Sequence, residues 1–280
     1  MNNPEGYVRS MQLQYRDARE VIEEFAEEFK AMDGRIIDIG CGPGTVLKDL
    51  LLPKVGGNAI VVGADISEAM LDYAKEHHAN EKRLSFIELD IETSDLPTNL
   101  IAQFHHATAF YCLNWCRNIE VAAGNIYKLL QPGGKAIAML NSYHIVFDFY
   151  LEQQKDPKFS AYMQDALKYF PPHYGYPNPE EKLRRQSEGA GLKVLQWSNR
   201  RKVFVYETID LMLDILMAVN PFLHRMPEDV SKEYRKDMEM RTRNDLRQRI
   251  KNENSDETTV DDHYTSLVAL FEKPRNEISF

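Results

Sequence analysis

The sequence predicts an α/β fold in which a mostly parallel sheet carries helices on both faces. Short apolar runs alternate with stretches of helical spacing along the first half of the chain. The run 36–39 leads directly into Gly40-Cys41-Gly42-Pro43-Gly44, a turn with glycines at alternate positions. Acidic residues, Asp65 and Asp90, follow the next two apolar runs. Parallel strands that present their carboxyl ends to a ligand have this pattern.

Composition sets the size and broad class of the molecule. A chain of 280 residues has room for one large α/β domain with an elaboration, so we expect a single domain over 1–280. The formal net charge of −9 argues against a nucleic-acid partner, since such proteins usually carry a basic face. No apolar run reaches membrane-spanning length, and the first residues lack a signal-peptide pattern. Three cysteines form no disulfide framework, which favours a reducing, cytoplasmic location.

The glycine turn and the acids indicate what kind of ligand binds. Glycine lets backbone N–H groups approach a ligand without a Cβ in the way. Asp38, near the end of the first strand, suits a cationic ammonium group better than a phosphate. Asp65 follows about twenty residues later, where α/β nucleotide folds place an acceptor for ribose hydroxyls. Asp90 and Ile91 are placed for an adenine amino group and an apolar wall. A nicotinamide dehydrogenase is disfavoured, because it would have Gly-x-Gly-x-x-Gly.

An acid followed by Gly-x-Gly-x-Gly resembles the first motif of the S-adenosylmethionine-dependent methyltransferases. The Pro-Gly turn within 130–135 is similar to the one that precedes this family's fifth strand. The resemblance implies a Rossmann-like, seven-stranded methyltransferase sheet and S-adenosyl-L-methionine as cofactor. The positions that match its cofactor site are Asp38, Gly40, Cys41, Gly42, Gly44, Asp65, Ile66, Asp90, Ile91 and Phe110.

Two further segments resemble a narrower family, the insect juvenile hormone acid methyltransferases. They are Ser10-Met11-Gln12-Leu13-Gln14-Tyr15-Arg16-Asp17-Ala18 and Phe110-Tyr111-Cys112-Leu113-Asn114-Trp115. In that family a glutamine amide and a tryptophan N–H bind the substrate carboxylate, and Gln14 and Trp115 match. The resemblance implies a small isoprenoid acid, farnesoic or juvenile hormone acid, as substrate and its methyl ester as product. Without the resemblance, Gln14 is an exposed helical residue and Trp115 is core filler.

The remaining segments predict helices that are added to the basic sheet. We expect one amphipathic helix over 7–32, short helices near 145–153 and 157–168, and a helix that starts at Asn178-Pro179. Two more follow strand 193–206: an apolar helix over 208–219 and a charged one over 228–251. A flexible loop, 252–262, precedes the last strand, 264–271. The elements 7–32, 142–178 and 207–262 are expected to form an inserted helical cap that binds substrate.

Several alternatives stay open at this stage. The pairs His77-His78 and His105-His106 lack accompanying ligands at metal-site spacing, so we predict no metal. A methyltransferase of another small hydrophobic acid fits the aromatic and Met-rich segments equally well. A catalytically weak paralogue that only binds cofactor or hormone would keep the same motifs. The sequence leaves the oligomeric state open, a homodimer included.

Overall fold

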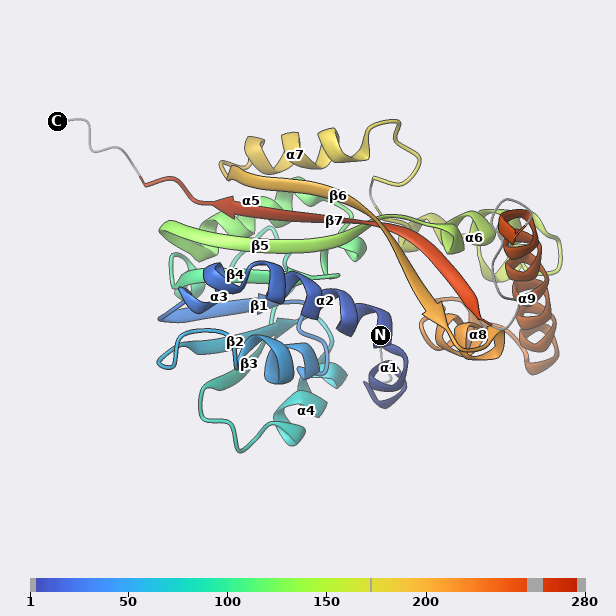
Figure 1. Ribbon diagram of the computed structural model, residues 1–280, viewed down its shortest axis with the longest axis horizontal. Helices are drawn as coiled ribbons and strands as arrows, with labels where there is room; N and C mark the ends of the chain where they lie inside the picture. Colours follow the sequence, from blue (N-terminus) through green and yellow to red (C-terminus); the bar gives the residue numbers. More distant parts are fainter. Residues whose placement is uncertain (1–3, 172, 251–258, 276–280) are drawn as a thin grey trace.

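The computed structural model describes residues 4–171, 173–250 and 259–275. Its centre is a sheet of seven strands in the order β3-β2-β1-β4-β5-β7-β6 (Figure 1). The strands are β1 Arg35–Ile39, β2 Ile60–Asp65, β3 Leu84–Glu88, β4 Phe104–Phe110, β5 Leu130–His144, β6 Lys193–Tyr206 and β7 Val260–Glu272. Neighbours from β3 to β5 are parallel, whereas β7 runs antiparallel between β5 and β6. The predicted α/β class and the seven-stranded sheet are confirmed.

The strand order places a ligand crevice at the end of β1. The chain runs outward from β1 through β2 to β3 and then returns to β4 on the opposite side of β1. In open α/β sheets, ligands bind where the strand order reverses, outside the carboxyl ends of the strands. The loops that follow β1 and β4 therefore border the candidate site.

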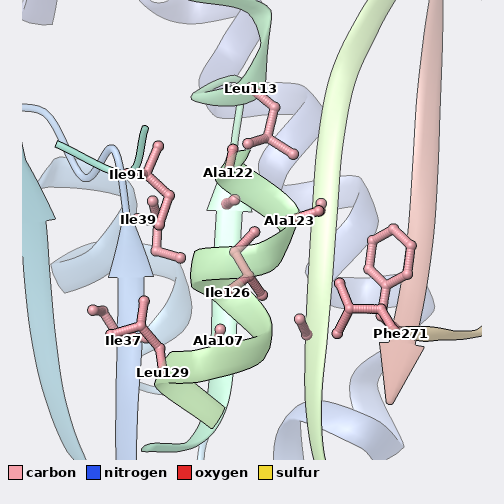
Figure 2. Packing of buried hydrophobic residues seen from close by; sticks show 14 of the residues in the cluster. Ile37, Ile39, Ile91, Ala107, Leu113, Ala122, Ala123, Ile126, Leu129 and Phe271 are labelled. Atoms are coloured by element: carbon pink, nitrogen blue, oxygen red, sulfur yellow. The ribbon is translucent and has the colours of Figure 1, made fainter. Parts of the chain in front are cut away.

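Helices cover both faces of the sheet, as expected. The α-helices of the described chain are α1 Pro4–Ser10, α2 Gln12–Glu24, α3 Ala26–Lys30, α4 Glu68–His77, α5 Ile119–Leu129, α6 Ile145–Lys155, α7 Pro179–Gly189, α8 Ile209–Ala218 and α9 Glu228–Ile250, of which α6, α8 and α9 lie outside the sheet. Side chains alternate between the faces along β1. Ile36 packs with α2 and α3, while Ile37 and Ile39 pack with α5 on the other face. Figure 2 shows Ile126 and Leu129 of α5 against this second set.

A third apolar core lies outside the sheet. Its aromatic and aliphatic side chains come from α6, α8, α9 and the turns within residues 156–171 and 173–176. We call these elements together the cap. In Figure 1, α6, α8 and α9 gather beyond one end of the sheet, where β6 and β7 bend toward them. The helical insertion between β6 and β7 was predicted. The aromatic segment after β5 joins the same core.

Three predicted elements differ from the structure. The single helix over 7–32 is wrong: the segment forms α1, α2 and α3, with breaks at Met11 and Phe25. At the first break, the Ser10 hydroxyl donates to the Tyr7 carbonyl (3.1 Å), a side-chain bond that competes with helical pairing. The breaks let both Met11 and Phe25 turn into the apolar interior.

The other two differences lie next to the cap. Residues 157–168 form 3₁₀ turns at Ser160–Tyr162 and Ala166–Tyr169 in place of a helix. At the start of this segment the Lys158 N–H donates to Asp156 Oδ1 (2.9 Å), a side-chain bond that competes with helical pairing. The flexible loop predicted over 252–262 is wrong at its end, since residues 260–262 extend β7 by antiparallel pairing with β6. Residues 252–258 lie outside the described part of the chain.

Candidate active site

The glycine turn after β1 is shaped by close backbone contacts. Gly40 has φ +72°, and a Cβ on it would overlap the Cβ of Cys112. Its N–H donates to the carbonyl of Ala64 at the end of β2 (2.7 Å). Gly42 has φ +55°, and the nearest atom to a Cβ there would be a Tyr7 ring carbon at 3.9 Å. Gly40 is therefore required both by packing and by its backbone conformation, whereas Gly42 is required by its backbone conformation alone.

Asp65 ties the end of β2 to this turn. Its Oδ2 atom accepts from the N–H of Gly42 (2.8 Å), and its Oδ1 atom accepts from the N–H of Ser67 (2.9 Å). Each carboxylate oxygen can accept a further hydrogen bond. The carboxylate is thus held rigidly by backbone groups while it keeps acceptor capacity for a ligand hydroxyl.

A cavity of about 780 Å³ lies over the glycine turn and the ends of β2, β3 and β4. We call it the cofactor cavity. Of the residues predicted to bind cofactor, those that line it are Gly40, Gly42, Asp65, Ile66, Asp90, Ile91 and Phe110. Glycine backbone, the carboxylates of Asp65, Asp90 and Glu92, and apolar side chains in a cavity of this size suit a nucleoside that carries a cationic group. The residues present therefore fit S-adenosyl-L-methionine.

Three residues predicted for this site lie outside the lining. The Cys41 thiol packs toward the sheet, where a Cβ on Gly63 would lie 2.9 Å from its sulfur. Gly44 faces the His78 imidazole, and a Cβ on Gly44 would lie 2.9 Å from that ring, so its role there is packing. Asp38 is 3% exposed, and its Oδ1 atom accepts from the hydroxyl of Thr108 on β4 (2.6 Å). Direct contact of these side chains with cofactor thus stays a prediction.

Burial changes the acidity of Asp38. Removal from water raises the pKa of its carboxyl group to about 7, and the charge of Asp65 adds to this effect. The hydrogen bond from Thr108 opposes the increase. A cationic ligand nearby would favour the ionised form.

Trp115 stands between two cavities. It ends a 3₁₀ turn, Leu113–Trp115, that follows β4, and its side chain is 45% exposed. The core-filler interpretation of Trp115 is therefore wrong. Trp115 lines the cofactor cavity and also a neighbouring cavity of about 110 Å³, which we call the chamber. Tyr7 and Tyr111 also line both.

Gln14 lines the chamber together with Trp115. The Oε1 atom of its amide is buried, and no described residue donates to it. The two residues predicted to bind a carboxylate, which are about 100 positions apart in the chain, are thus brought to one cavity. Cap residues, including Phe147, Tyr150 and Leu216, form much of the remaining wall.

The polar network beneath Gln14 could not be predicted from spacing. Asp17, one helical turn further along α2, has no exposed surface. Its Oδ2 atom accepts from the hydroxyls of Tyr111 (2.5 Å) and Tyr264 (2.6 Å). The Lys202 ammonium lies 2.7 Å from its Oδ1 atom, and Arg16 donates to the same oxygen. The network joins α2 to β6, β7 and the end of β4, and thereby fixes the helix that carries Gln14.

Tyr111 takes part in this network from a strained backbone position. Its φ of +61° lies in the left-handed region, which bulky residues rarely adopt. Its N–H donates to the carbonyl of Met139 on β5 (2.8 Å), and its hydroxyl is bound by Asp17. Burial and the charge of Asp17 raise the pKa of the Tyr111 hydroxyl. Tyr111 is therefore neutral, and its one hydroxyl hydrogen is donated to Asp17.

His144 lines the chamber with both ring nitrogens engaged. The N–H of Val146 donates to its Nδ1 atom (3.1 Å), so the ring proton resides on Nε2. Nε2 then donates to the Oδ2 atom of Asp262 (3.0 Å). A ring in this arrangement has no free nitrogen that could take a proton from a substrate.

Within the described ranges, no cluster of three or more His, Cys, Asp or Glu side chains is arranged to hold a metal ion. The described helices include none with the length and apolar character needed to span a bilayer. All three cysteines are free thiols.

Comparison with known proteins gives a consistent picture. A family model described as a methyltransferase domain matches residues 37–136. The chain is 36% identical to the juvenile hormone acid O-methyltransferase of Drosophila melanogaster over 84% of its length and 80% of the relative. It is 32% identical to the enzyme of the same name from Bombyx mori, over 85% and 84% of the two chains.

Solved structures agree on the fold. One is a phosphoethanolamine N-methyltransferase 2 of Haemonchus contortus in complex with phosphomonomethylethanolamine and S-adenosylhomocysteine. It superposes with a TM-score of 0.53 at 16% identity, over 91% of this chain and 53% of that one. At this identity the likeness concerns the fold alone.

Proposed function

The chain belongs to the juvenile hormone acid O-methyltransferase family of S-adenosyl-L-methionine-dependent methyltransferases, and from this we propose that it methylates the carboxylate of an apolar isoprenoid acid. Farnesoic acid and juvenile hormone acid are the proposed substrates, and the methyl ester is the product. The observation that carries the proposal is that Gln14 and Trp115 line one chamber, which shares Trp115 with the cofactor cavity.

The cofactor, when bound, supplies an electrophilic methyl group on a sulfonium centre. Asp65 would bind its ribose, and Asp90 with Ile91 its adenine. The acid substrate has a pKa near 4, so it is already an anion at neutral pH and needs no base. The engaged ring nitrogens of His144 agree with a reaction that uses none.

What the chain contributes is position and the exclusion of water. The Gln14 amide and the Trp115 indole N–H would orient the carboxylate toward the cofactor cavity. Correct placement of two reactants can supply about 7–11 kcal/mol of the barrier. Tyr111 and the cap side chains form part of the chamber wall and would displace water from a bound acid.

Neutral donors suit this reaction better than a cation. None of the described residues that line the chamber is Lys or Arg. Arg16 of α2 is turned away: its guanidinium donates to the Val203 carbonyl (2.7 Å) and lies 4.7 Å from the Phe204 ring centre. A guanidinium on the carboxylate would stabilise the charge that must be lost in the transition state.

The side chains that line the chamber favour an apolar acid, whereas the chamber volume does not determine how long that acid is. The cap contributes Phe147, Tyr150, Ile215 and Leu216 to the chamber wall. A cavity of about 150 Å³ holds one benzene ring, so the chamber's 110 Å³ cannot enclose a whole isoprenoid chain by itself. A longer acid must extend into the cofactor cavity or displace cap side chains. A shorter hydrophobic acid is therefore the alternative substrate, and a weakly active paralogue that binds cofactor or hormone is a further one.

The test is methyl transfer from labelled S-adenosyl-L-methionine to a panel of isoprenoid and fatty acids of increasing length. We expect ester formation, with the binding free energy of the acid becoming more favourable by up to ~0.8 kcal/mol for each additional buried methylene group. Faster methylation of a short dicarboxylate than of a fifteen-carbon isoprenoid acid would contradict the proposed substrate class. Cofactor binding without turnover of any acid would favour the paralogue that only binds.

We also propose that the protein works in the cytosol. Its three free thiols support a reducing compartment.

A further inference from the structure

One of the residues that line the chamber has a buried carboxylate oxygen without a hydrogen-bond partner among the described residues. Asp262 of β7 is 2% exposed and lines the chamber beside His144. Its Oδ1 atom is buried, and no described residue donates to it. An unpaired acceptor of this kind destabilises the fold, and buried polar groups are as a rule matched by protein, ligand or ordered water.

The rest of the Asp262 carboxylate is fixed. His144 donates from Nε2 to the Oδ2 atom of Asp262 (3.0 Å), and Val146 N–H holds the opposite ring nitrogen. His144 is itself buried. The pair therefore presents one oxygen, Oδ1, in a set position, and the imidazole can supply no second donor to it.

Two other chamber-lining residues have a buried oxygen that lacks a partner in the described part of the chain, and the chemistry of these oxygens differs from that of Asp262. They are Gln14 Oε1 and Asn141 Oδ1, both buried. Both belong to amides, which can rotate to present an NH₂ donor in place of the oxygen. A carboxylate has no donor to present. Asp262 is thus the position where the ligand must bring the hydrogen.

We propose that Asp262 accepts a hydrogen bond from a hydroxyl group of the substrate, so that this site binds a hydroxylated apolar acid more tightly than the same acid without the hydroxyl. This inference rests on the proposed function. A hydroxyl has one hydrogen to place, which matches the one free oxygen. An ammonium group has three, and the largely apolar chamber wall does not offer that many acceptors. A second carboxylate would be repelled at this point.

The two ends of the substrate are then recognised differently. Gln14 and Trp115 orient the carboxylate, and Asp262 selects the hydroxyl. All three line a chamber of about 110 Å³, so the hydroxyl lies near the carboxylate in the bound acid, not at the far end of an extended chain. The hydroxyl thus adds a second polar contact that an acid without it cannot make.

The test uses sets of three matched acids, in which one position carries a hydroxyl, a hydrogen or a methyl ether. The sets differ in how far that position lies from the carboxylate. Dissociation constants are measured by calorimetry with S-adenosylhomocysteine present, so that binding is read without turnover, and kcat/KM is measured in parallel. We expect the hydroxy acid of at least one set to bind the wild-type protein roughly 10- to 100-fold more tightly than both partners, as for a hydrogen bond to a charged group.

The variant Asp262→Asn inverts the chemistry of the site. Its amide oxygen can accept from His144 Nε2, which leaves the NH₂ group to face the chamber. The hydroxy acid should lose its advantage, while the methyl ether, which offers only an acceptor, should gain. Asp261→Asn is the matched control, since it changes the preceding carboxylate of β7, which is not in the chamber wall, and should leave the order of the three acids unchanged.

The outcomes separate this inference from the proposed function. Methylation of isoprenoid acids with equal affinity for all three members of every set would mean that a water satisfies Asp262, which overturns the inference and leaves the proposed function intact. Tight, selective binding of the hydroxy acid without methylation would support the inference and overturn the proposed function. If Asp262→Asn does not fold, the wild-type preference for hydroxyl over methyl ether decides the matter.

Discussion

The cofactor cavity and the chamber are assembled in different ways. The residues proposed to bind cofactor polar groups, from Gly40 to Ile91, lie at the ends of β1, β2 and β3, where backbone turns and short-range hydrogen bonds fix them, although α1 and the cap also contribute to the cavity wall. The chamber draws on α2, β5, α6, α8 and β7, from Gln14 to Asp262. Local rules thus govern the first region, whereas tertiary contacts govern the second. The same chain can keep its cofactor site while its substrate site diverges.

The largest expected effect concerns the network that supports the chamber. Asp17→Asn removes the carboxylate that binds Tyr111, Tyr264 and Lys202 in the interior. Removal of one partner from a buried ion pair usually costs about 3–5 kcal/mol of stability. Urea denaturation should show this loss. Glu23→Gln, an exposed change on the same helix, should stay within about 0.5 kcal/mol of wild type, and an equal result for both variants would contradict the support role.

A slightly smaller effect is expected at the turn that forms the cofactor cavity. Gly40→Ala places a Cβ in overlap with that of Cys112, in a left-handed conformation. Strain and overpacking together should destabilise the fold by about 2–4 kcal/mol, with loss of cofactor binding. Gly124→Ala in α5 meets no atom within 4 Å and should be neutral or stabilise the helix by up to about 1 kcal/mol. Thermal melting of both variants checks the contrast.

Replacement of Asp65 should weaken cofactor binding and leave the protein folded. In Asp65→Ala the ribose loses a charged acceptor, and the N–H groups of Gly42 and Ser67 lose theirs. Cofactor affinity should fall roughly 10- to 100-fold by calorimetry. Asp72→Ala on α4, whose side chain is 66% exposed, is the control and should bind normally. Wild-type affinity in a folded Asp65→Ala protein would remove Asp65 from the site.

The smallest expected effect is a pH dependence set by Asp38. Its pKa is raised to about 7, above the usual value near 4, so without cofactor the folded state loses stability as pH rises from about 4 to 7. A cationic cofactor favours the ionised carboxylate. Its dissociation constant should therefore decrease, by at most about tenfold per pH unit, until about pH 8 and then level off.

Turnover at saturating cofactor should not share the pH dependence of cofactor affinity. The rate at saturating cofactor should stay flat from about pH 6.5 to 8.5, because the acid substrate is ionised throughout. Asp38→Asn keeps an acceptor for Thr108 and should make cofactor affinity independent of pH. A steep pH dependence of turnover that disappears in His144→Gln would instead reveal a base.

The same contrast explains what the sequence could predict. The positions of Gly40, Gly42 and Asp65 at the cofactor cavity could be predicted, because few structures place a glycine turn and an acid at the ends of strands. The burial of Asp38 could not be predicted, since a shift of one residue along β1 changes which face of the sheet a side chain lies on. The position of Trp115 past β4 followed from the strand order.

Most of the residue contacts that build the chamber could not be predicted from the sequence. Asp17 and Tyr264 are 247 positions apart, and His144 and Asp262 are 118 apart, so no spacing rule pairs them. The helix breaks at Met11 and Phe25 could not be predicted, because the amphipathic period runs through Phe25 and the Ser10 side-chain bond at the first break is a feature of the structure. The one signal present in the sequence was the abundance of aromatic residues after β5, which indicated an apolar core without its partners.

The most direct test of carboxylate positioning is a double-mutant cycle on Gln14→Leu and Trp115→Phe. The variants keep approximate size and remove only the amide and the indole N–H. Each should lower kcat/KM for the acid roughly 10- to 100-fold, as expected for loss of one hydrogen bond to a charged group. The double variant should fall by less than the product of the two, because both donors bind one carboxylate. Cofactor affinity should remain within about twofold of wild type. Near-normal turnover in both single variants, or an equal loss of cofactor binding, would contradict the account.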